Sequence, residues 1–194
     1  NLSVEQGKPV SLVGPSGSGK TTLLAIMAGL DLPTAGTVRL LGSQITNLDE
    51  DKRAQIRGKD VGFVFQSFHL MPRLSALDNV MLPLEISGDP QSLDKAYEAL
   101  KQVGLSNRAK HFATQLSGGE KQRVAIARSI VNKPKILFAD EPTGNLDKKS
   151  SSSITDLIFS LNELTQTALV LVTHDLSLAE KCDEVYELSE GQLL

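Results

Sequence analysis

The chain of 194 residues lacks features that several protein classes require. It contains a single cysteine, Cys182, which excludes disulfides within the chain and metal clusters held by cysteines. No apolar run reaches the ~18 residues that a membrane-spanning helix needs. The first residues do not form the apolar segment of a secretory signal. We therefore expect neither a spanning helix nor a disulfide-stabilised secreted protein.

An excess of positive charge is also absent. The formal net charge is −3, from 20 Lys and Arg residues against 23 Asp and Glu residues, and no basic cluster stands out. Nucleic acid is therefore disfavoured as a partner, and so is a direct electrostatic membrane anchor. At this length, folding buries about 70% of the surface of the unfolded chain, which is enough for one substantial core.

The strongest positive signal is a glycine-rich loop at residues 14–21, which reads Gly-Pro-Ser-Gly-Ser-Gly-Lys-Thr. An apolar run at 9–13 predicts a strand before it, and apolar residues at helical spacing from Leu23 to Leu30 predict a helix after it. Strand, loop and helix in this order are typical of a polyphosphate site. The glycines let the backbone aim successive N–H groups at one anion, and the helix N-terminus adds partial positive charge.

Residue types within this loop indicate their chemistry. We expect Lys20 to reach the β- and γ-phosphates of a nucleotide and Thr21 to place its hydroxyl on Mg²⁺. The other residues expected to bind the nucleotide here are Gly14, Pro15, Ser16, Gly17, Ser18, Gly19 and Thr22.

Two carboxylates end a second apolar run, at residues 136–139. Ligands of an α/β sheet sit beyond the carboxyl ends of its strands. Asp140 is therefore expected to hold Mg²⁺, directly or through water. Glu141 is placed to polarise a water for attack on the γ-phosphate. Without the glycine-rich loop, the same pair would suit a solvated acidic turn equally well.

A third signal is Leu-Ser-Gly-Gly-Glu-Lys-Gln-Arg at residues 116–123. Ser117 is a typical helix N-cap, and a helix expected from about Glu120 would offer unpaired N–H groups to an anion. One triphosphate does not need two such sites in one chain. Ser117, Gly118 and Gly119 are therefore interpreted as facing the nucleotide of another copy, although spacing alone favours an ordinary capped helix with a Gly-Gly turn.

In chain order, these segments resemble the nucleotide-binding domain of ABC transporters, and the resemblance covers essentially the whole chain. Its motifs are residues 14–21, Gln66 after an apolar strand, Leu-Ser-Gly-Gly at 116–119, Ala-Asp-Glu-Pro at 139–142, Gly-Asn-Leu-Asp at 144–147 and Thr-His-Asp at 173–175. Segments 63–68, 77–83 and 138–147 resemble the subgroup that serves lipoprotein release and macrolide export. That subgroup also includes an ATPase paired with a division-site membrane protein.

The resemblance implies roles that spacing alone does not assign. Gln66 would sense Mg²⁺ and the attacking water. His174 would hydrogen-bond the γ-phosphate, and Asp147 would line a dimer interface nearby. Residues 117–119 would contact the γ-phosphate held by the opposite subunit. Together with Glu141, these residues imply an ATPase that is competent for hydrolysis, with Lys20 and Gln66 in its catalytic set.

The resemblance also implies an assembly. The chain would bind ATP and Mg²⁺, form a homodimer around two ATP molecules, and drive export or envelope extraction through separately encoded integral membrane permease subunits. The segment from Leu70 to Pro83 would receive a short helix from such a subunit. The chain would be peripheral, on the cytoplasmic face of the bacterial inner membrane. Because it begins at Asn1 without Met, we expect a truncation that removes an adenine-stacking aromatic residue.

The same site residues fit a second function, a regulatory ATPase of the division-site type that transports nothing. Other nucleotide-dependent classes fit less well. A DNA-maintenance ATPase would require a long coiled coil or zinc cysteines, and a ribosome-associated ATPase usually carries two cassettes. A GTPase would carry Asn-Lys-x-Asp or Thr-Lys-x-Asp, which does not occur.

Strand and helix patterns that alternate along the chain predict an α/β fold. We expect a P-loop NTPase core, with a mostly parallel sheet flanked by helices, a helical subdomain insert and a small antiparallel β portion. Residues 1–66 and 131–194 would form the ATP-binding core, and residues 67–130 the helical subdomain. Other expected elements are strands at 2–4, 37–41, 61–65 and 168–173, a hairpin around Gly191, and a charged helix from a capping box at 47–50 through Arg57.

Overall fold

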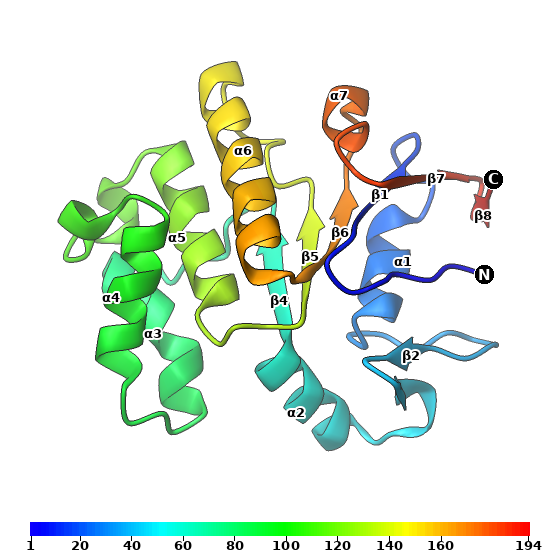
Figure 1. Cartoon of the computed structure of the whole chain (residues 1–194), viewed down its shortest axis with the longest axis horizontal. Helices are drawn as coiled ribbons and strands as arrows, with labels where there is room; N and C mark the ends of the chain where they lie inside the picture. The colour runs from blue at the N-terminus through cyan, green and yellow to red at the C-terminus, as the bar shows by residue number, and fades with distance from the viewer.

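A six-stranded sheet runs through the middle of the molecule in the computed structural model, which describes residues 1–194 (Figure 1). Its strands are β1 (Pro9–Val13), β4 (Val61–Phe65), β5 (Ile136–Asp140), β6 (Ala168–Val172), β7 (Glu184–Ser189) and β8 (Gln192–Leu193). They lie in the order β4-β5-β6-β1-β7-β8, and every neighbouring pair is parallel except β7 with β8. The predicted fold class is confirmed.

Helices cover both faces of this sheet. Along β5, Leu137 and Ala139 point into one hydrophobic cluster, whereas Ile136 and Phe138 point into a second cluster on the other face. The helices α5 (Gly118–Ile130), α6 (Lys148–Thr165) and α7 (Leu176–Ala179) border the first cluster, and α1 (Lys20–Met27) and α2 (Glu50–Asp60) border the second. Burial on both faces explains why the central strands are almost entirely apolar.

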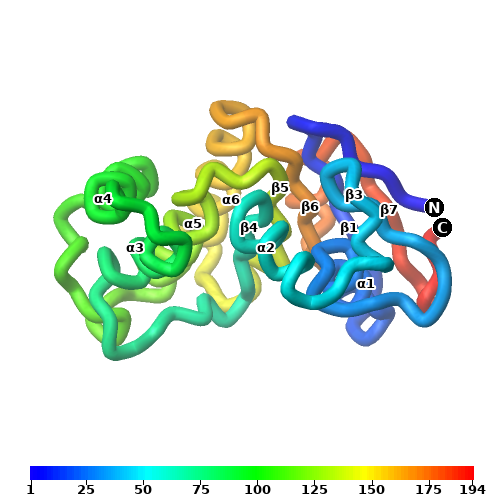
Figure 2. Tube along the Cα trace, turned by 90° about the horizontal axis from the view of Figure 1, so that it is seen from below, coloured from blue at the N-terminus to red at the C-terminus, as the bar shows by residue number.

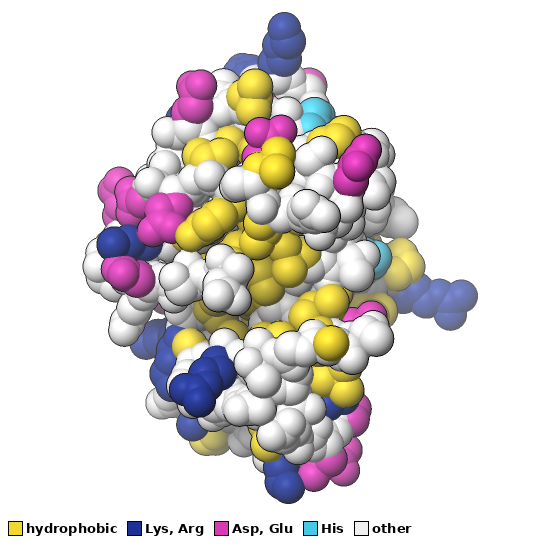
Figure 3. Space-filling model, turned by 90° about the vertical axis from the view of Figure 1, so that its right-hand side faces the viewer, with side chains coloured by type: hydrophobic (Ala, Val, Ile, Leu, Met, Phe, Trp, Pro, Cys, Tyr) yellow, Lys and Arg dark blue, Asp and Glu magenta, His cyan; other side chains and the backbone are white.

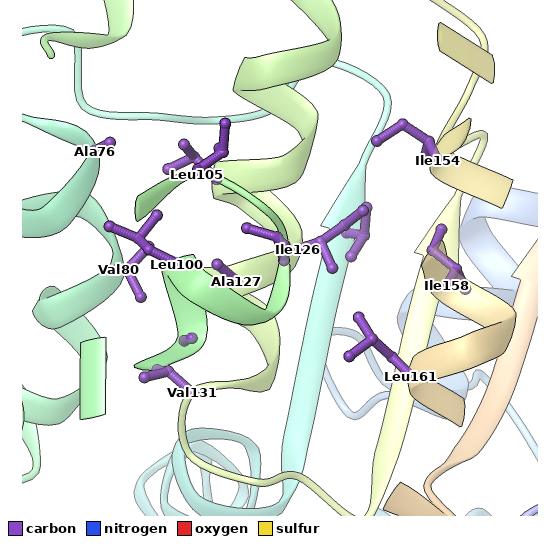
Figure 4. Packing of buried hydrophobic residues seen from close by; sticks show 14 of the residues in the cluster. Ala76, Val80, Leu100, Leu105, Ile126, Ala127, Val131, Ile154, Ile158 and Leu161 are labelled. Atoms are coloured by element: carbon purple, nitrogen blue, oxygen red, sulfur yellow. The ribbon is translucent and has the colours of Figure 1, made fainter. Parts of the chain in front are cut away.

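The helix α5 packs between the sheet and a helical pair, α3 (Ala76–Ile86) and α4 (Ser92–Gln102). Ile126 of α5 faces the sheet and α6, whereas Ala127 faces Val80 and Leu100 (Figure 4). Two 3-10 turns, η2 (Ser106–Arg108) and η3 (Ala113–Gln115), lead into α5. Viewed from below, α3, α4 and α5 lie at one end of the molecule and α1, β1 and β7 at the other (Figure 2).

One cluster of 24 buried residues extends from the sheet through α5 to α3 and α4. The helical region and the sheet therefore share a continuous core. The division into residues 1–66, 67–130 and 131–194 stays a prediction.

The sequence patterns did not predict α3. Pro83 lies inside this helix, where proline removes a backbone hydrogen bond and usually ends a helix. Ser75 and Asp78 form a capping box that starts α3, and buried Val80 and Leu84 hold it against the helical core. Tertiary packing therefore outweighs the local penalty.

Several predicted boundaries were wrong. The N-cap of α2 is Asp49, whose side chain accepts the N–H of Lys52, and the helix continues past Arg57 to Asp60. Residues 2–4 form no strand because no other strand pairs with them. The strand expected at 37–41 is only β2 (Arg39–Leu40), which pairs with β3 (Ser43–Gln44) across a turn at Gly42. The hairpin around Gly191 is confirmed as β7 and β8.

Hydrophobic side chains gather at the centre of the face shown in Figure 3, with charged side chains around them. Both chain ends lie on this side of the molecule (Figure 1). Leu2, Val4 and Leu193, close to the chain ends, are half-buried residues that pack against the second cluster.

No helix in the structure has the length and apolar character to cross a membrane.

We expect Leu100→Ala to lower the free energy of unfolding by about 2–5 kcal/mol. Leu100 is fully buried in the cluster that joins α4 to α5, so the shorter side chain leaves a cavity. Urea unfolding of the purified protein measures the change. Leu93→Ala is the control, because Leu93 lies on the same helix but is half-exposed. Equal losses for the two variants would contradict the role of Leu100 in the core.

Candidate functional site

The glycine-rich loop joins the end of β1 to the start of α1, at the edge where the parallel strands end (top of Figure 1). Gly14, Gly17 and Gly19 all have positive φ. At Gly14, whose φ is 148°, an added Cβ would lie 2.1 Å from the carbonyl oxygen of Leu188 on β7. Only glycine therefore lets the loop pass so close to β7.

The ammonium of Lys20 lies within this loop. The residue is 8% exposed, and its Nζ donates hydrogen bonds to the carbonyl oxygens of Gly14 and Pro15, each at 2.8 Å. The loop backbone thus fixes a positive charge beside the N-terminus of α1, where unpaired N–H groups already favour an anion.

Thr21 and Asp140 meet across the site, as their positions predicted. The hydroxyl of Thr21 donates to Asp140 Oδ2 at 3.1 Å. The other carboxylate oxygen, Asp140 Oδ1, is buried without a hydrogen-bond partner. A buried, unpartnered carboxylate oxygen beside a hydroxyl fits a hard divalent cation. No cluster of three His, Cys, Asp or Glu side chains offers a complete metal cage.

Glu141 and His174 form a second pair. Oε1 of Glu141 lies 2.9 Å from Nδ1 of His174. Glu141 has a φ of 46°, a left-handed conformation that non-glycine residues rarely adopt. Its N–H donates to the carbonyl oxygen of Val172, at 2.9 Å, so the end of β6 fixes the strained residue. Strain of this kind is frequent at functional sites.

Gln66 follows β4 and is tied to the loop that follows β5. Its Nε2 donates to Oδ1 of Asn145 at 3.2 Å, and Nδ2 of Asn145 donates to the carbonyl oxygen of Gln66 at 3.0 Å. Gly144 permits this approach, because a Cβ there would lie 2.7 Å from Gln66 Nε2. The sequence placed Asn145 in a motif, but no spacing indicated its bonds to Gln66.

These residues line one pocket of about 630 Å³. The lining residues are Ser16, Gly17, Gly19, Lys20, Thr21, Thr22, Gln66, Asp140, Glu141, Val172 and His174. The carbonyl oxygens of Gly14 and Pro15 accept hydrogen bonds from Lys20, and the hydroxyl of Ser18 is buried without a partner. The structure therefore gathers the loop, both carboxylates, Gln66 and His174 at one place.

Seven predicted site residues do not line this pocket: Gly14, Pro15 and Ser18 of the glycine-rich loop, and Ser117, Gly118, Gly119 and Asp147. Ser117 caps α5 in a capping box with Glu120. Asp147 caps α6, and the N–H of Ser150 that it accepts holds the pKa of this carboxyl below its usual range. The two helix starts are adjacent, because a Cβ on Gly119 would lie 3.2 Å from Ser150 Oγ.

The capping box uses the N–H groups of Ser117 and Glu120 and leaves those of Gly118 and Gly119 without acceptors. The helices α5 and α6 begin at the same edge of the molecule as the glycine-rich loop (Figure 1). One chain thus carries two groups of unpaired N–H donors at one edge, and only one of them belongs to the pocket.

Two polar residues of α5 that the sequence analysis did not single out contact the loops of the site. Gln122 donates to the carbonyl oxygen of Pro142 at 2.6 Å. Arg128 donates to the carbonyl oxygens of Phe68 and His69 at 3.0 and 2.7 Å. Burial lowers the pKa of the Arg128 guanidinium. The available signal was a polar side chain among the apolar positions of a helix.

The fold and the pocket define a nucleotide-binding α/β protein of the P-loop class, and comparisons with known proteins agree. A family model described as ABC transporter matches residues 1–144. The chain is 53% identical over 194 residues to YbbA of Escherichia coli (strain K12), an uncharacterized ABC transporter ATP-binding protein. This alignment covers 99% of this chain and 85% of YbbA. It is 47% identical over 195 residues to LolD of Xanthomonas campestris pv. campestris (strain 8004), the lipoprotein-releasing system ATP-binding protein. That alignment covers 100% of this chain and 82% of LolD.

Solved structures of the ATP-binding cassette MJ0796 have the same fold. A dimeric post-hydrolysis state bound to ADP and Pi is 42% identical, with a TM-score of 0.90, and covers 100% of this chain and 86% of that chain. A second dimeric structure, of MJ0796 as a bacterial ABC transporter cassette, is 43% identical with the same TM-score and coverage. The chain belongs to the ABC transporter family and is an ATP-hydrolysing cassette of that family. The predicted resemblance, including that to the lipoprotein-release subgroup, is confirmed.

We expect Gly14→Ala to abolish measurable nucleotide binding, because the new Cβ collides with Leu188 and displaces the carbonyl that holds Lys20. Titration with a fluorescent ATP analogue measures the affinity. Gly36→Ala is the matched control, since Gly36 also has positive φ but open space around it. The Gly36→Ala variant should bind the ATP analogue as the wild type does. Its folding free energy should fall by about 1–2 kcal/mol, because only backbone strain is added. Equal affinities for the two variants would count against the close approach at Gly14.

Proposed function

We propose that this ATPase works as a two-fold dimer with two composite sites, each completed by residues 117–119 of the opposite chain. The observation that carries the proposal is the separation of two groups of N–H donors, of which only the glycine-rich loop lines the pocket. In a C2 dimer each chain can offer both surfaces at once, so two equivalent sites form. The dimeric structures of MJ0796 support this arrangement.

Binding of ATP would rest on the glycine-rich loop. The N–H groups of residues 16–22 and the N-terminus of α1 would receive the phosphates. Lys20 would exchange its two carbonyl acceptors for phosphate oxygens. Residues 117–119 of the opposite chain would contact the γ-phosphate, and Asp147 would line the interface next to them.

Thr21, Asp140 and Gln66 would hold Mg²⁺. A cation held by these residues would neutralise charge on the phosphoryl group that is transferred. The unpartnered Oδ1 of Asp140 supports this role. Gln66 would give up its hydrogen bond with Asn145 in order to contact the cation.

Hydrolysis would depend on Glu141 and His174. Glu141 would take a proton from the attacking water, a role that requires hydrogen-bond reach. Nδ1 of His174 already lies 2.9 Å from that carboxylate. His174 would also hydrogen-bond the γ-phosphate and so hold the Glu141 carboxylate and the γ-phosphate in their relative positions. Positioning and charge neutralisation would supply most of the rate acceleration. ATP binding would close the dimer, and hydrolysis with phosphate release would reopen it.

We expect Glu141→Gln to lower the kcat of ATP hydrolysis by roughly 100- to 10,000-fold while ATP still binds and the dimer stays closed. The amide keeps the shape of the side chain but cannot accept the proton. Steady-state turnover and size-exclusion chromatography with ATP measure the two effects. Glu163→Gln, an exposed position on α6, is the control. Wild-type turnover of Glu141→Gln would remove Glu141 from the base role.

We expect Ser117→Arg to impair hydrolysis while the monomer still binds ATP, because the long side chain blocks only the surface offered to the opposite chain. Ser117→Ala is the control, since it removes the N-cap bond, at about 1 kcal/mol, without adding bulk. Turnover and ATP affinity are measured for both. Loss of nucleotide binding by the Arg variant as a monomer would refute the composite site.

The work coupled to this cycle is proposed to be export or envelope extraction through separate integral membrane permease subunits. The chain would then be peripheral, on the cytoplasmic face of the bacterial inner membrane. Support comes from the 47% identity to LolD, an ATP-binding protein of a lipoprotein-releasing system. Residues 70–83, which include the half-exposed Met71, would receive a short helix of the permease.

A regulatory ATPase of the division-site type is the alternative, and the identity of the membrane partner separates the two. Full-length Glu141→Gln protein with ATP is used as bait in detergent-solubilised membranes, and bound proteins are identified by mass spectrometry. A large membrane protein with periplasmic domains supports export or extraction. A division-associated membrane protein, or soluble partners alone, would replace transport by the regulatory function.

A further inference from the structure

We propose that Gln122 is a positioning residue for ATP hydrolysis, which holds the loops of Gln66 and Glu141 in their relative places from α5. The inference rests on the proposed function, because that function gives Gln66 and Glu141 their chemical roles. Gln122 itself does not line the pocket and would not touch the nucleotide.

One side-chain amide contacts both loops. Nε2 of Gln122 donates to the carbonyl oxygen of Pro142 at 2.6 Å and lies 3.4 Å from that of Phe65. Pro142 directly follows Glu141, and Phe65 directly precedes Gln66. Each contact is therefore one residue from a side chain that lines the pocket.

The burial of Gln122 indicates that its amide acts through these contacts. The residue is 0% exposed, and its Oε1 is buried without a hydrogen-bond partner. A buried unpaired acceptor is unfavourable. An apolar side chain of the same length would avoid that penalty. What glutamine alone adds at this position is the pair of donor contacts to the loops.

The contact with Pro142 bears on the strained conformation of Glu141. Glu141 has a φ of 46° and begins a turn in which the N–H of Gly144 donates to its carbonyl oxygen at 3.0 Å. Such a residue keeps its conformation only where the surroundings fix it. Gln122 holds the carbonyl group of Pro142, the residue that follows Glu141. Without this bond the turn can relax and carry the carboxylate away from His174.

The contact at Phe65 bears on the loop of Gln66. Gln66 and Asn145 link the same two loops on the exposed side, and Gln122 links them on the buried side. Further along α5, Arg128 holds the carbonyl oxygens of Phe68 and His69. The helix α5 thus holds this loop at two places, Phe65 and Phe68–His69.

This arrangement connects the two halves of a composite site. The helix α5 begins with the residues offered to the opposite chain and also carries Gln122, within one regular segment. A displacement of α5 on dimer closure would therefore reach Gln66 and Glu141 of the same chain through one hydrogen-bonded amide.

The principal test is Gln122→Met, which keeps the side-chain length but removes both donor contacts. We expect the kcat of ATP hydrolysis to fall roughly 10- to 100-fold. The KM for ATP should stay near the wild-type value, because Gln122 does not touch the glycine-rich loop. Ser129→Ala on α5 is the matched control. Its hydroxyl donates to Ile126 within the helix at 2.7 Å and contacts neither loop, so its kcat should be unchanged.

A double-mutant cycle with Gln66→Ala distinguishes positioning from general stability. If Gln122 acts through Gln66, the fall in kcat for the double variant is smaller than the product of the two single falls. If Gln122 had a purely structural role, the fall in kcat for the double variant would equal the product of the two single falls. If Gln122→Met does not fold, Gln122→Asn replaces it, because that shorter amide cannot reach both carbonyl oxygens.

Wild-type kcat in Gln122→Met, an equal loss in Ser129→Ala, or multiplicative effects in the cycle would each overturn the positioning role. The proposed function fails differently. Wild-type turnover in Glu141→Gln and Gln66→Ala would reject the roles of those residues. Loss of turnover in both, with wild-type turnover in Gln122→Met, would reject the present inference alone.

Discussion

The parallel register of the central strands is the constraint on which the site depends. Phe65 pairs with Asp140, and Asp140 and Leu12 both pair with Val172. The residues that follow these positions therefore emerge side by side at one edge. They are Gln66, Glu141, the glycine-rich loop and the segment before His174. Because parallel strands all end at the same edge, the backbone pairing itself assembles the chemistry.

The helix α5 gives this edge its second level of organisation. It contributes to the hydrophobic cluster on one face of the sheet and packs against the helical pair of α3 and α4 beyond it. Two of its polar side chains, the buried Gln122 and the half-buried Arg128, reach back to the loops after β4 and β5. In the proposed dimer, this helix would transmit movement between subunits to the pocket, because it packs between the sheet and the helical pair and is bonded to the loops of Gln66 and Glu141. Local sequence gives no direct sign of these contacts.

The sequence by itself determined the fold class and most of the pocket, because each motif is contiguous and its chemistry is local. The loop at 14–21 requires glycine at specific backbone conformations, and apolar runs that end in Asp140 or precede Gln66 identify strands that meet a ligand. The resemblance to ABC transporter cassettes supplied the roles proposed for His174 and Asp147. The chain alone also predicted that residues 117–119 form a separate anion-binding segment.

Tertiary structure decided what local signals could not contain. The helix α3 forms despite Pro83 because packing outweighs the lost hydrogen bond, and residues 2–4 form no strand because no edge accepts them. The bond between Gln66 and Asn145 and the contacts of Gln122 join residues far apart in the chain. Such pairings are set by strand register and helix packing, which depend on the whole core. The sequence therefore specified the reactive groups, and the tertiary structure decided how they are held.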